Sequence, residues 1–194
     1  MAKPELIKRS GWAFVAGAFA FITLLSGSDP IAIPGSVVSA ILLAVGMSGL
    51  RSGYGETISP FGSNMLRVGV LGPVVWVIGV PFMAILGLKA QEEGSWVLLF
   101  VGPAISLLGL VLFGMTALRS KPMPRLNWLP FVTGIWYPVA YSFLAGYLFT
   151  HDSKFPQQYY PALPLMFLIQ FLALGRFGVV LLTDKTEEMA TASY

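Results

Sequence analysis

The same short motif closes two long apolar runs of this chain. The first copy is Gly46-Met47-Ser48-Gly49-Leu50-Arg51-Ser52, and the second is Gly114-Met115-Thr116-Ala117-Leu118-Arg119-Ser120. A third apolar run ends in a looser version, Ala173-Leu174-Gly175-Arg176. An apolar helix that ends in an arginine is typical of a membrane span whose end reaches the lipid headgroups. The motif therefore predicts a chain that reaches the same side of a bilayer three times.

The composition indicates a membrane protein. Hydrophobic residues make up 56% of the 194 residues and charged residues only 11%, whereas a soluble domain carries about 25% charged residues. The apolar blocks are 16 to 24 residues long, enough to cross a hydrocarbon core of about 30 Å. These blocks do not alternate between apolar and polar residues, so they favour helices over the strands of a membrane barrel.

We predict an all-α fold, a polytopic transmembrane bundle that forms a single domain over residues 1–194. Asp29 and Ser63-Asn64 are the expected starts of the second and third helices, because such residues cap helix N-termini. The first apolar stretch follows a basic start and also resembles a secretory signal, but we interpret it as a membrane helix. The six predicted spans cover residues 11–26, 31–50, 66–88, 95–118, 128–150 and 161–183.

Positive charge is strongly one-sided across these six spans. With the N-terminus inside, ten lysines and arginines fall on the inner side and only Lys89 and Lys154 on the outer side. The positive-inside rule therefore predicts a plasma-membrane protein with both termini in the cytoplasm. The two motif copies, 68 residues apart, both end even-numbered helices, which favours a parallel repeat of helical hairpins over an inverted repeat. The predicted inner-face arginines are Arg51, Arg119, Arg125 and Arg176.

Two groups of polar residues lie inside the predicted spans. Thr133, Tyr137 and Tyr141 recur every four residues and share one helix face, with Gln170 of the last helix as a candidate partner. We favour an interhelical hydrogen-bond seam over a ligand pocket. Arg176 lies about 22 Å along the last helix, either as a side chain that snorkels to the headgroups or as a functional buried charge.

The sequence shows no pattern typical of a catalytic, metal-binding or nucleic-acid-binding site. There is no cysteine, and the one histidine, His151, stands beside Asp152 and Ser153, where neighbours on a helix do not face each other. The predicted spans contain no acidic residue. We expect no catalytic residue, no metal and no cofactor apart from bound lipid, and no nucleic-acid partner, because the basic residues flank apolar runs instead of clustering.

Several local patterns resemble those of small uncharacterised bacterial six-helix integral membrane proteins. The resemblance implies a six-helix membrane fold and carries no known activity. It is carried by Ile7-Lys8-Arg9-Ser10-Gly11, by the first motif with Tyr54-Gly55-Glu56, Gly62 and Gly69, and by Ala117-Leu118-Arg119 with Pro124-Arg125-Leu126-Asn127-Trp128.

Two functions fit these expectations. The first is a non-catalytic accessory or structural subunit of a larger membrane complex, in contact with the bilayer and with other membrane subunits. The alternative is a small transporter or channel for a small or lipophilic solute, which the prolines of the third, fourth and fifth helices favour. A membrane enzyme would need an acid–base pair that the sequence does not place.

Overall fold

The computed structural model describes residues 3–23, 29–54, 57–85, 95–123, 127–136 and 162–183, and these residues form helices with no strand among them. The all-α prediction is therefore confirmed. A further helical segment covers residues 129–136. The helices are α1 (Pro4–Phe21), α2 (Asp29–Gly53), α3 (Pro60–Ile85), α4 (Ser95–Ser120) and α6 (Ala162–Thr183).

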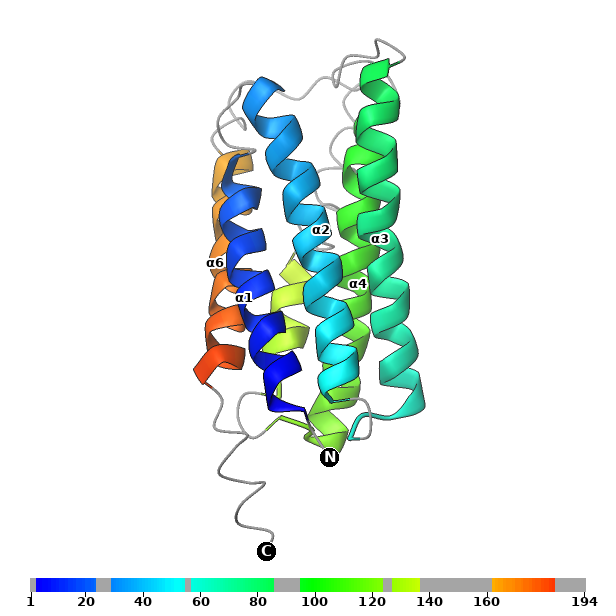
Figure 1. Cartoon of the computed structure of the whole chain (residues 1–194), viewed down its shortest axis with the longest axis vertical. Helices are drawn as coiled ribbons and strands as arrows, with labels where there is room; N and C mark the ends of the chain where they lie inside the picture. The colour runs from blue at the N-terminus through cyan, green and yellow to red at the C-terminus, as the bar shows by residue number, and fades with distance from the viewer. Residues whose placement is uncertain are drawn as a thin grey trace, which may run out of the picture.

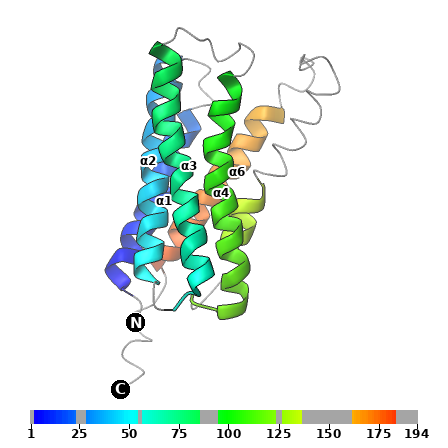
Figure 2. The same cartoon turned by 90° about the vertical axis from the view of Figure 1, so that its right-hand side faces the viewer.

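The helices run up and down along one common axis, each antiparallel to its neighbours (Figures 1 and 2). Helix α1 packs against α2 and α6, and α3 packs against α2 and α4. The segment 129–136 contacts α4 where Gly134 meets Leu107, and it contacts α6 where Gln170 meets Thr133. Contacts therefore follow the chain order and return from α6 to α1, as expected when short connections join antiparallel helices.

Two helices begin earlier than predicted. Helix α1 starts at Pro4, where proline suits the first turn, and the N–H of Lys3 bonds to the carbonyl of Gly53 at 2.8 Å. Helix α3 starts at Pro60, because the Ser59 hydroxyl caps it by accepting the Gly62 N–H at 3.1 Å. The expected start at Ser63-Asn64 was wrong, since Ser59-Pro60 supplies an earlier cap.

The other helix boundaries lie within a few residues of the prediction. Helices α2 and α4 continue to Gly53 and Ser120, and α4 ends where Lys121 adopts a φ of 46°. Of the predicted fifth helix, residues 129–136 are helical and 137–150 lie outside the described residues, as do 24–26 and 86–88 of the first and third predicted helices.

Among the described residues, three helices are long and apolar enough to cross a membrane. These stretches are Ile33–Gly53, Pro60–Gly79 and Val101–Ser120, and a shorter apolar helix covers Leu168–Thr183. Helix α1 carries Glu5, Lys8 and Arg9 within its 18 residues, which makes it more polar than these three. Membrane localisation is compatible with these helices, whereas the count of six spans stays a prediction.

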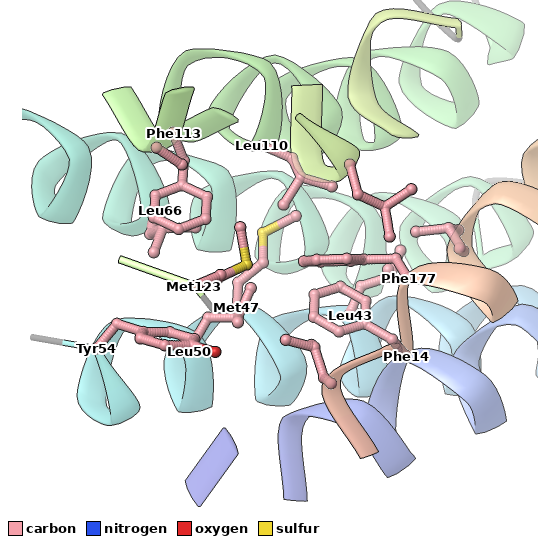
Figure 3. Packing of buried hydrophobic residues seen from close by; sticks show 14 of the residues in the cluster. Phe14, Leu43, Met47, Leu50, Tyr54, Leu66, Leu110, Phe113, Met123 and Phe177 are labelled. Atoms are coloured by element: carbon pink, nitrogen blue, oxygen red, sulfur yellow. The ribbon is translucent and has the colours of Figure 1, made fainter. Parts of the chain in front are cut away.

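Large apolar side chains fill the centre of the bundle (Figure 3). Phe14 of α1 and Phe177 of α6 are fully buried, with ring centroids 4.9 Å apart. Leu43 and Met47 of α2 and Leu110 of α4 meet them from the other side, with exposures of 0–2%. In lipid the hydrophobic effect does not drive helices together, so this dense van der Waals packing supplies the attraction.

Glycines bring the helices into backbone contact at two crossings. A Cβ atom on Gly109 of α4 would lie 2.5 Å from the Cα of Gly69 of α3. A Cβ atom on Gly178 of α6 would lie 2.6 Å from the carbonyl oxygen of Gly11 of α1. Any larger residue would separate the backbones, so these glycines determine how closely each helix pair approaches.

Candidate functional site

One end of the bundle collects the basic residues. Helices α2 and α4 end there, and α1 and α3 begin there (Figure 1). The contact of Lys3 with Gly53 joins α1 to α2, and the close approach of Gly62 to Thr116 joins α3 to α4. Both motif arginines, Arg51 and Arg119, therefore lie at the same end of the molecule.

The predicted inner-face arginines differ in their surroundings. Arg51 is half-buried, and its Nε donates a hydrogen bond to Ser63 Oγ at 3.1 Å, which links the end of α2 to the start of α3. Arg119 is exposed in the last turn of α4. Arg176 is exposed on α6, so the structure does not place it as a buried charge. Arg125 lies outside the described residues.

The two motif copies do not occupy equivalent environments. In the first copy Met47 and Leu50 are fully buried in the core. In the second copy the corresponding Met115 and Leu118 are 48% and 44% exposed. The helices present different faces of the same seven-residue pattern to the bundle, and the property that the copies share is the position of the arginine.

The structure brings Thr133 and Gln170 of the predicted polar seam together. Gln170 Nε2 donates to the backbone carbonyl of Thr133 at 3.2 Å, and both residues are almost fully buried. The acceptor is the carbonyl, not the hydroxyl that the sequence suggested. Thr133 Oγ1 and Gln170 Oε1 have no hydrogen-bond partner in the described part of the chain. Tyr137 and Tyr141 lie outside it.

Two polar contacts were not anticipated from the sequence. Ser39 of α2 donates from its hydroxyl to the carbonyl of Gly17 of α1 at 2.9 Å, a buried bond between helices. Asn127 closes the turn after α4: its Oδ1 accepts the Met123 N–H at 3.0 Å and its Nδ2 donates to the Met123 carbonyl at 2.7 Å. A serine inside an apolar run is the only signal the first contact offered, and such a serine more often bonds within its own helix.

Apart from the phenol of Tyr54, the buried polar side chains of the described ranges carry no ionisable group. They are serines, one threonine and one glutamine, and no group of three or more His, Cys, Asp or Glu residues that could hold a metal ion lies within those ranges. These residues can form neutral hydrogen bonds between helices. His151 lies outside the described residues. The buried polar side chains are Ser10, Ser36, Ser39, Ser106, Thr133 and Gln170.

These features define an all-helical bundle with helices that can cross a membrane, a filled apolar centre and one basic end. Comparison with protein-family models, with curated proteins and with solved structures found no match.

Proposed function

We propose that the protein is a non-catalytic structural subunit of a larger membrane complex, with six spans in the plasma membrane. The observation that carries this proposal is the packed apolar centre that the described residues form along the bundle axis. Phe14, Met47, Leu110 and Phe177 come from four helices, and each is completely buried. A conducting pathway along this axis would need water-accessible polar groups, whereas these side chains serve packing.

The outer surface supports placement in a bilayer. Helix α3 exposes a continuous apolar row in which Leu71, Ile78 and Phe82 are 56%, 64% and 55% exposed. Exposed apolar area of this extent suits lipid or another membrane subunit. The one-sided basic residues support cytoplasmic placement of the end that holds Arg51 and Arg119.

The absence of cysteine allows a direct test of this topology. Single cysteines at position 120, near the basic end, and at position 92, between α3 and α4, can be labelled with a membrane-impermeant maleimide in intact cells. We expect labelling at position 92 and none at position 120 until the cells are opened. The reverse pattern would contradict the proposed orientation.

Subunit function is tested by purification in a mild detergent after cross-linking in the native membrane. We expect the full chain, tagged and expressed at its native level, to elute with larger membrane subunits. Recovery as a lone monomer, with no cross-linked partner before or after solubilisation, would refute the assembly role.

One observation favours the alternative, a small transporter or channel. Thr133 Oγ1 and Gln170 Oε1 are buried polar atoms with no partner among the described residues, and a buried atom of this kind costs about 1–3 kcal/mol unless it is satisfied. A solute could supply the missing hydrogen bonds. Solute flux into liposomes that is lost in Gln170→Leu, with the fold intact, would support this function over a structural one.

A further inference from the structure

The basic end carries a large local excess of positive charge. Within the described residues, this end holds seven lysines and arginines and one acidic residue, Glu5. Such an excess attracts anionic lipid headgroups at a membrane surface. The basic residues are Lys3, Lys8, Arg9, Arg51, Arg67, Arg119 and Lys121.

A side chain on a neighbouring helix fixes the guanidinium of Arg51. The bond from Nε to Ser63 Oγ uses one edge of the group. This bond leaves the Nη1 and Nη2 atoms outside the contact with Ser63. A guanidinium held in this way presents a paired set of donors that matches two oxygens of a phosphate.

A second arginine lies one helical turn beyond Ser63 on α3. Arg67 is exposed and lies four residues after Ser63 on α3, so the two share a helix face and are separated by about 6 Å along the axis. Arg51 therefore contacts α3 one helical turn before Arg67.

Apolar side chains continue from this pair toward the middle of the bundle. On α3 the exposed row is formed by Leu71 and Val74, four and seven residues after Arg67, which are 56% and 47% exposed. A row that starts at Arg67 and runs along the helix suits an acyl chain whose headgroup lies at the arginines.

We propose that Arg51, Ser63 and Arg67 form a binding site for the phosphate of an anionic phospholipid. This proposal rests on the membrane placement proposed above. Arg51 and Arg67 hold the phosphate by charge-assisted hydrogen bonds, and Ser63 positions Arg51 from α3. The apolar row on α3 favours a lipid over a free phosphate ion, because an ion would not use it.

The test measures lipid retained by the full chain after purification from mixed phosphatidylglycerol and phosphatidylcholine bilayers, by native mass spectrometry. Wild type is expected to retain phosphatidylglycerol preferentially. The double variant Arg51→Gln/Arg67→Gln is expected to lose at least tenfold of this preference, about 1.4 kcal/mol or more, since it removes both charge-assisted donors. The matched control Arg119→Gln removes an exposed charge at the same end and is expected to keep most of the preference.

Two further variants separate a built site from general charge attraction. Ser63→Ala keeps both arginines and removes the contact that orients Arg51, so the preference is expected to fall to an intermediate value. Arg51→Lys/Arg67→Lys keeps the charge and loses the planar fork, so it too is expected to weaken retention. Unchanged retention in both variants, or an equal loss in Arg119→Gln, would overturn the site.

Two controls separate the possible failures. Inorganic phosphate that displaces the lipid at millimolar concentration would show an anion site without lipid specificity and would overturn the lipid assignment. Alkaline carbonate washing of native membranes tests membrane integration independently. If carbonate extracts the chain from the membrane, both the proposed membrane function and this site are refuted. If the chain stays in the membrane but shows no lipid preference, only the site is refuted.

Discussion

The crossing of α3 and α4 makes the strongest stability prediction. Gly109 lies against Gly69, and a Cβ atom added to it would be 2.5 Å from Gly69 Cα, 2.7 Å from Gly69 N and 2.7 Å from Met65 O. All three neighbours are backbone atoms, so no side chain can rotate away. Gly109→Ala must therefore move the two helices apart by several tenths of an ångström or more.

The expected loss of stability in Gly109→Ala is estimated by comparing it with alanine at a second glycine. Overpacking of a tight contact costs about 1–3 kcal/mol, while replacing glycine by alanine in a helix returns about 1 kcal/mol. Gly175 of α6 is the matched control, because among the described residues its added Cβ would meet only Ala18 Cβ, at an ordinary 3.9 Å. Both variants gain the same helix propensity, so Gly109→Ala should be less stable than Gly175→Ala by about 2 kcal/mol.

The assay is reversible unfolding in mixed micelles of mild detergent and dodecyl sulfate, followed by tryptophan fluorescence and circular dichroism. Gly175→Ala is expected at or above wild-type stability and Gly109→Ala below it. Equal stability of the two variants would show that α3 and α4 can separate without loss, and the glycine-contact reasoning would then be wrong.

The remaining predictions use the same unfolding assay. Phe177→Ala should lower the free energy of unfolding by about 3–5 kcal/mol, because the ring is fully buried against Phe14; a loss no larger than that of exposed Ile78→Ala would contradict the filled core. Gln170→Leu should change stability by less than about 1 kcal/mol, since it removes one bond and one buried oxygen without a described partner; a large loss would show that Oε1 is bonded. Lys121→Gly should raise the free energy of unfolding by about 1 kcal/mol, because Lys121 has a φ of 46°, in the left-handed region that favours glycine. A lower free energy of unfolding would mean that the Lys121 side chain makes a stabilising contact.

The helix boundaries show where local sequence is informative. The end of α2 near Arg51 and the end of α4 near Arg119 were predicted within three residues, because long apolar runs and their flanking charges are local features. Helix α3 starts at Pro60, six residues before the predicted span at residue 66, because Ser59 and Ser63-Asn64 offer competing caps and the Ser59 hydroxyl accepts the Gly62 N–H.

The functional contacts were predicted less completely. Thr133 and Gln170 were paired from the sequence, but the acceptor was assigned to a hydroxyl instead of a backbone carbonyl. The bond between Arg51 and Ser63 was not anticipated, because the two residues are twelve positions apart across a turn whose path the sequence does not specify. Contacts between elements require the relative rotation of both helices, which no single segment contains.

The sequence by itself determined that the chain is helical and apolar, and which residues end each run. It did not determine which face of each helix points inward. A helix that meets lipid on one side and protein on the other is apolar all round, so no polar face marks its orientation. Only the tertiary structure buries Met47 and Leu50 while it exposes Met115 and Leu118 of the same motif, because glycine contacts and side-chain shapes, not hydrophobicity, decide how such helices rotate against one another.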